Sequence, residues 1–211
     1  MHGQRFFRMR REAVGYALGS VCFFLGPWPW YVALVGPVAA NATFVVGSLL
    51  FAAAGAVQLL LTGRTPRRAF ATRGGVLDWS SAVLHLVGAA LFTVSTTAAV
   101  VAALETPDAD GIGWNADAWG SAAFVLAGML ALAALQRRHE LWDMGARTPG
   151  TTWLTVFGSL AFATSTIGAS FVPQSVAIVG LGWPDVGTVV GAGCFFAAAV
   201  VARPSVTAPE A

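Results

Sequence analysis

The sequence predicts an all-α membrane protein: a bundle of six transmembrane helices built from three helical hairpins that repeat in parallel. Three observations predict this fold class. Of the 211 residues, 56% are hydrophobic and only 10% are charged, whereas an ordinary soluble domain has about 25% charged residues. The uncharged residues are gathered in six long stretches. The five-residue pattern Gly-[Ser/Ala]-x-x-Phe occurs once in each of these stretches.

Each apolar stretch is long enough to cross a bilayer. The hydrocarbon core requires about 20 residues of helix at about 1.5 Å per residue. A helix is expected because its backbone amides bond to one another where no water is available. The predicted spans are 13–35, 42–61, 79–104, 118–135, 152–172 and 186–202. They form one integral membrane domain, 1–211, with hairpins at about 13–62, 78–136 and 152–202 and tails at 1–12 and 203–211.

The repeated pattern predicts how these helices pack. Its Gly and Phe are four positions apart, so they lie on one helix face. Lipid tails are as apolar as leucine, so association in a bilayer depends on small residues that let backbones approach closely. We interpret the pattern as a packing motif in which a Phe ring fills the space beside a neighbouring glycine; a ligand-binding surface is the alternative. The motif residues are Gly19, Phe23, Gly47, Phe51, Gly88, Phe92, Gly120, Phe124, Gly158, Phe162, Gly191 and Phe195.

The spacing of the motif predicts internal repetition. The motif advances by a nearly constant step in the odd-numbered spans, and again in the even-numbered spans. This regularity favours three hairpins of the same topology, related by an axis roughly along the membrane normal. Polar residues lie near the starts of the even-numbered spans, where we expect helix caps and consider an outward-facing cation site as the alternative. These residues are Asn41, Asn115, Asp117 and Asp185.

The first span contains two prolines. Pro27 and Pro29 each lack a backbone donor and clash with the preceding turn, which predicts a kink or break in 13–35. The arginine-rich start, the apolar run and the sequence at 40–42 also resemble a secretory signal with a cleavage site. We expect the segment to be retained, because its removal would leave the second span without a partner.

Polar side chains occur within the second and third hairpins. His85 is an ionisable group inside a span and therefore a candidate functional residue. An interhelical hydrogen bond of about 1 kcal/mol or less is the alternative. Hydroxyl groups follow the motif Phe in the third and fifth spans, where they either line a polar cavity or bond to carbonyls one turn back. The candidate polar path consists of His85, Ser95, Thr96, Thr164 and Ser165.

The charges predict an orientation. All basic residues are arginines, and they fall in the tails and in the second and fourth loops. The other three loops contain no arginine. Because cytoplasmic loops of membrane proteins carry an excess of basic residues, we expect a multi-pass protein of the bacterial inner membrane with both termini in the cytoplasm.

The segment Asn41-Ala-Thr-Phe-Val-Val-Gly-Ser-Leu-Leu-Phe51 resembles the signature of the YrhK-like family of small bacterial membrane proteins. The whole pattern is similar to uncharacterised multi-pass proteins of actinobacteria that contain this unit. The match is weaker in the second and third hairpins, where Asp replaces Asn and the Ser of the motif becomes Ala in the third and sixth spans. The resemblance implies the architecture and transfers no catalytic or binding residue.

The sequence favours a non-enzymatic structural or accessory membrane component. We find no P-loop, no Gly-x-Ser-x-Gly elbow and no His-Glu-x-x-His motif, so we expect no catalytic residue, no metal and no cofactor. The expected partners are the lipid bilayer and either a second copy of the chain or a membrane complex, but not nucleic acid. The alternative is a small transporter or channel lined by His85 and the hydroxyl groups. A dry, packed centre would favour the first function, and a polar cavity reaching mid-membrane would favour the second.

Overall fold

The computed structural model describes residues 2–62, 74–105, 114–142, 147–171, 177–178 and 181–202. These residues form seven helices and one pair of two-residue strands, so the predicted all-α class is confirmed. The helices are α1 (His2–Leu25), α2 (Pro29–Val35), α3 (Pro37–Thr62), α5 (Gly75–Glu105), α6 (Trp114–Arg138), α7 (Arg147–Phe171) and α8 (Trp183–Val201). The antiparallel strands β1 (Ala177–Ile178) and β2 (Leu181–Gly182) lie before α8.

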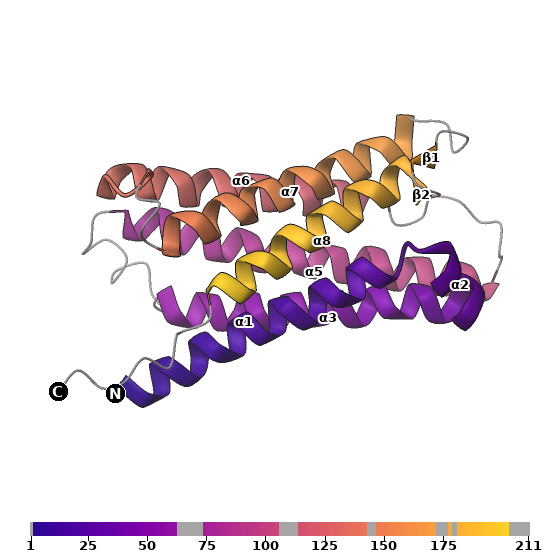
Figure 1. The fold of residues 1–211 in the computed structure, drawn as a ribbon, viewed down its shortest axis with the longest axis horizontal. Helices are drawn as coiled ribbons and strands as arrows, with labels where there is room; N and C mark the ends of the chain where they lie inside the picture. Colours follow the sequence, from indigo (N-terminus) through magenta and orange to yellow (C-terminus); the bar gives the residue numbers. More distant parts are fainter. Residues whose placement is uncertain are drawn as a thin grey trace.

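The six long helices form a closed ring. Each of them packs against the next in the order α1, α3, α5, α6, α7 and α8, and α8 packs against α1 (Figure 1). Helix α1 begins and α8 ends at the same end of this bundle, on the left in Figure 1, which we call the terminal end. Helix α2 lies at the opposite end, which we call the α2 end. The Phe side chains of the motif are buried together in the hydrophobic core.

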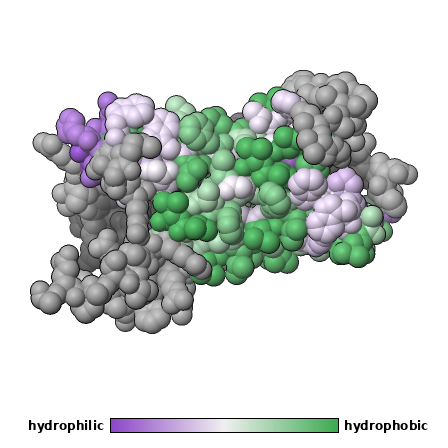
Figure 2. Space-filling view, in the orientation of Figure 1, coloured by the Kyte–Doolittle hydropathy of each residue, from purple (hydrophilic) through white to green (hydrophobic). Residues whose placement is uncertain are grey.

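Four helices are long and apolar enough to cross a membrane, judged by length and composition within the described residues. They are Pro37–Leu60, Gly75–Glu105, Ala116–Arg138 and Trp183–Val201, with mean hydropathies between 1.6 and 1.9. The bent pair α1 and α2 makes a fifth if it is counted as one span. Apolar side chains cover the middle of the face shown in Figure 2. The chain is therefore suited to a membrane, with four or five qualifying spans in place of the six expected.

The first predicted span is broken. Helix α1 ends at Leu25, α2 begins at Pro29, and the two axes differ by 91°. Pro27 has no N–H to continue α1, and its ring would clash with the carbonyl one turn earlier. Pro29 occupies the first turn of α2, where a missing N–H costs nothing. The expected interruption is thus confirmed, and the expectation of one span over 13–35 is corrected to two helices.

One of the expected helix caps differs from the observed structure, and another is confirmed. Helix α3 begins at Pro37, so Asn41 lies inside the helix and not at its start. Asp185 does act at a helix start, where it accepts a hydrogen bond from the Gly182 N–H at 3.2 Å. Several arginines used to predict orientation lie outside the described residues: Arg64, Arg67, Arg68, Arg73 and Arg203, and the side chains of Arg5, Arg8, Arg10, Arg11 and Arg147.

Candidate functional site

The two motif copies of each hairpin face each other. Every motif glycine lies against the motif Phe of its partner helix, so that each hairpin contains two reciprocal Gly–Phe contacts. A methyl group added at Gly158 would come within 2.7 Å of the Phe195 ring, and one at Gly191 would come within 3.1 Å of Phe162. The six contacts are Gly19–Phe51, Gly47–Phe23, Gly88–Phe124, Gly120–Phe92, Gly158–Phe195 and Gly191–Phe162.

The six motif Phe rings meet at the centre of the bundle, and we call them the Phe cluster. The rings of α1, α5 and α7 (Phe23, Phe92 and Phe162) contact one another with centroids 5.6–6.4 Å apart. The rings of α3, α6 and α8 form a second triangle at 5.3–6.4 Å. Pairs within each hairpin join the two triangles at 5.3–5.7 Å. Each ring therefore contacts three others, and the cluster has the arrangement of a triangular prism.

The Phe cluster is a strong packing centre. Its rings are at most 8% exposed, and aromatic pairs at these distances contribute roughly 0.5–1.5 kcal/mol beyond their buried area. The serines that follow the motif glycines lie in the same layer without an orphaned hydroxyl. Ser20 donates to the Tyr16 carbonyl at 2.7 Å, and Ser159 donates to the Thr155 carbonyl at 2.8 Å. Because these serines are small and bond to carbonyls of their own helices, the backbones of neighbouring helices can approach closely.

A cavity of about 10 Å³ lies among these rings. Its lining consists of five rings of the cluster together with Ser48, whose hydroxyl donates to the Val45 carbonyl at 2.9 Å. A cavity needs roughly 10–15 Å³ and two or more polar partners to hold one water molecule. This cavity is at the lower limit in size and has apolar walls. The centre of the bundle is consequently packed and apolar.

The candidate polar path is divided by the Phe cluster. His85 lies seven positions before Phe92 on α5, on the terminal side, whereas Thr96 lies four positions after it, on the α2 side. The two residues are separated by about 16 Å along the helix. Thr164 is exposed and bonds to the Ala161 carbonyl at 2.8 Å. The structure does not bring these side chains together around one cavity.

Of the remaining path hydroxyls, those of Ser165 and Thr96 form hydrogen bonds within or between helices. Ser165 on α7 donates to the Pro184 carbonyl at 2.6 Å and pairs with Thr188 on α8 at 2.9 Å. Ser95 is half-buried. Thr96 donates to the Phe92 carbonyl at 2.8 Å, which is the local bond expected of a helical threonine.

Two hydroxyl pairs connect neighbouring hairpins, and sequence reasoning missed both. Ser48 on α3 pairs with Thr96 on α5 at 3.2 Å, and Ser121 on α6 pairs with Thr166 on α7 at 2.9 Å. In each pair the Ser directly follows the motif glycine of its helix, and the Thr lies eight positions after the motif glycine of its own helix. Thr166 also donates to a carboxylate oxygen of Asp117 at 2.7 Å. Counting positions from the motif glycine was the signal that could have found these pairs.

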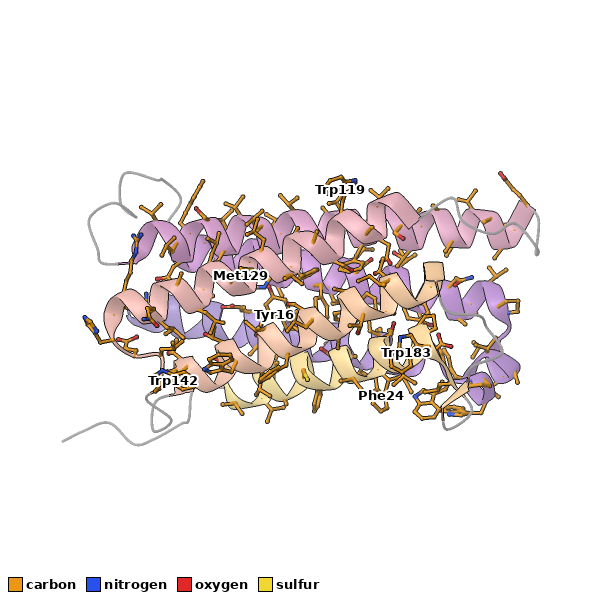
Figure 3. All side chains as sticks on the ribbon, turned by 90° about the horizontal axis from the view of Figure 1, so that it is seen from above. Tyr16, Phe24, Trp119, Met129, Trp142 and Trp183 are labelled. Carbon is orange, nitrogen blue, oxygen red and sulfur yellow. The ribbon has the colours of Figure 1, made fainter. Side chains whose placement is uncertain are left out.

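His85 is buried without a visible partner. Its side chain is 4% exposed, and neither imidazole nitrogen has a hydrogen-bond partner among the described residues. Its ring lies 5.4 Å from that of Phe124. Tyr16 occupies the same position in the first hairpin, three residues before the motif glycine, and its hydroxyl donates to Gln58 Oε1 at 2.9 Å. Tyr16 points into the bundle (Figure 3). The two rings thus lie on the terminal side of the Phe cluster.

Within the described residues, no group of three or more His, Cys, Asp or Glu side chains is placed to hold a metal ion. Comparisons of the chain with protein-family models, with curated proteins and with solved structures find no match. The packing at the centre of the bundle is therefore the feature that bears on function.

Proposed function

We propose that the protein is a six-span structural or accessory component of a bacterial cytoplasmic membrane, without enzymatic activity. The Phe cluster is the observation that supports this proposal. A transporter or channel needs a polar path along its axis, and here six Phe rings occupy that axis. Their interlocking with glycines is what a helix-packing function in lipid requires.

Six spans are supported by the closed ring of helices. Helices α1 and α7 hold motif Phe residues at the same level as those of the qualifying helices, so all six long helices share one depth in the bilayer. Helix α7 has 25 residues, or about 37 Å. Its hydroxyl groups lower its mean hydropathy, but many bond to carbonyls of the same helix, as Thr152 and Thr155 do at 2.8 and 2.9 Å. Such bonds reduce the cost of placing hydroxyls in lipid.

Threefold repetition of one hairpin is supported by the two Phe triangles and by the equivalent hydroxyl pairs between hairpins. The third equivalent site, between α8 and α1, has Ala192 and Pro27 in place of the Ser and Thr. The resemblance of residues 41–51 to the YrhK-like family favours the same architecture. We assign the terminal end to the cytoplasm, because α6 ends there with Arg137 and Arg138.

Reconstitution into sealed vesicles tests this function. We expect vesicles containing the protein to show the same permeability to protons, potassium, chloride and small neutral solutes as empty vesicles. Saturable flux of any of these would contradict the proposal, above all if His85→Ala or Thr96→Val abolished it. Thr164→Val is the matched control, because the Thr164 hydroxyl lies on the exposed surface and bonds to its own helix.

A further inference from the structure

Helix α2 is short, uncharged and turned across the axis of α1. We propose that it does not cross the membrane but lies in the plane of the outer leaflet, inserted at the boundary between phospholipid headgroups and acyl chains. This inference rests on the proposed membrane-spanning function. It assigns a lipid-binding surface to residues 29–35, which the sequence had placed in the first span.

The position of the break supports this surface. Helix α1 ends at Leu25, only two positions or about 3 Å beyond Phe23 of the Phe cluster. By comparison, α5 continues about 20 Å beyond Phe92 to Glu105. Helix α1 therefore stops well inside the leaflet. The chain then turns by 91°, so that α2 runs across the end of the bundle (Figure 1).

The start of α3 fixes the depth of α2. Pro37 lies ten positions before Gly47. Pro37 is therefore about 15 Å along the helix from the level of the Phe cluster. This is half the thickness of a hydrocarbon core of about 30 Å. Only Gly36 separates α2 from α3, and its φ of 84° lets the chain turn sharply there. The end of α2 is consequently held close to the boundary between acyl chains and headgroups.

The exposed face of α2 has the chemistry of a lipid contact. Helix α2 has no buried residue, and Leu34 and Trp30 are 75% and 56% exposed. In water this apolar surface would cost about 25 cal/mol per Å², and acyl chains remove that cost. Tyr31 holds α2 to α3 through a 2.7 Å hydrogen bond with Thr43. Trp and Tyr rings are the side chains that favour the headgroup level.

The absence of charge in the sequence 26–41 specifies the kind of lipid contact. A surface helix that recognises anionic headgroups carries Lys or Arg on its polar face. Helix α2 has neither, so its insertion should depend on acyl chains and be independent of anionic lipid. A continuing transmembrane segment and a surface covered by a second copy of the chain are the other possibilities that an experiment must separate.

Spin-label depth measurements on the full chain make this separation. Trp30→Cys and Leu34→Cys are placed one at a time in a Cys22→Ala, Cys194→Ala background and labelled with a nitroxide in vesicles of phosphatidylcholine. Positions 30 and 34 lie on one helix face. We expect equal depths, about 5–10 Å below the headgroups, that do not change when anionic lipid is added. Val46→Cys, at an exposed site next to Gly47, is the control and should report the middle of the bilayer.

Three results would overturn the inference. A difference of about 6 Å between positions 30 and 34 would mean that α2 continues the span. Label accessible only from water would mean that α2 does not enter lipid. Spin–spin broadening that disappears on dilution with unlabelled protein would mean that a second copy covers the surface. A deep Val46 label with an aqueous Leu34 label refutes this inference alone, whereas an aqueous Val46 label refutes the proposed function as well.

Discussion

Replacing Gly191 with alanine should destabilise the bundle, whereas the same change at Gly193 should not. A methyl group at Gly191 would lie 3.0 Å from the Gly158 carbonyl oxygen and 3.1 Å from the Phe162 ring. Nothing lies within 4 Å of a methyl group at Gly193. The two glycines are on the same helix, so the gain in helix propensity, about 1 kcal/mol for Gly→Ala, is common to both.

The difference between the two variants isolates the packing cost. Overpacking of a tight contact costs about 1–3 kcal/mol, and a backbone carbonyl cannot move aside as a flexible side chain can. Gly193→Ala should thus raise the free energy of unfolding by up to about 1 kcal/mol. The free energy of unfolding of Gly191→Ala should be about 1–3 kcal/mol lower than that of Gly193→Ala. Reversible unfolding in mixed micelles, followed by circular dichroism, measures both values. Equal stabilities for the two variants would refute the reciprocal Gly–Phe packing.

Three further substitutions test other parts of the structure in the same unfolding assay. Phe124→Ala should lower the free energy of unfolding by about 3 kcal/mol. This value is at the lower end for a buried Phe, because the unfolded helix also lies in an apolar solvent. A loss below about 1 kcal/mol would mean that the Phe cluster is not a packing centre. His85→Phe should raise the free energy of unfolding by about 1 kcal/mol, because it removes a buried group without a hydrogen-bond partner. A lower free energy of unfolding would indicate that His85 has a hydrogen-bond partner. A double-mutant cycle of Ser121→Ala and Thr166→Val should give a coupling energy of about 0.6 kcal/mol, and a value of zero would remove this contact between hairpins.

The sequence was most informative about which helix faces meet. The four-residue spacing of Gly19 and Phe23 placed both on one face, and the structure pairs each of them with the motif of the next helix. The arrangement of the six rings as two triangles was not predictable, because it depends on the order of helices around the ring. The break at Pro27 followed from the chemistry of proline, but proline alone did not predict the 91° angle between α1 and α2.

The sequence was less informative where local rules competed with one another and where contacts join different helices. Asn41 resembled a cap, but Pro37 is a favourable first residue and started α3 four positions earlier. His85 and Thr96 were grouped in the candidate polar path, the alternative to local hydrogen bonds, because both are polar residues inside one predicted span. Their positions relative to Phe92 place them on opposite sides of the Phe cluster. Ser121 and Thr166 meet across two hairpins, a contact that only a comparison of their positions relative to the motif glycines of two helices could have indicated.

The central claim is that six Phe rings close the axis of a membrane-embedded bundle. A cryo-EM structure of the full chain in lipid nanodiscs tests it most directly. We expect six helices across the lipid disc and two stacked triangles of rings, with centroids 5.3–6.4 Å apart. A water-filled passage along the axis, or motif rings turned toward lipid, would contradict it.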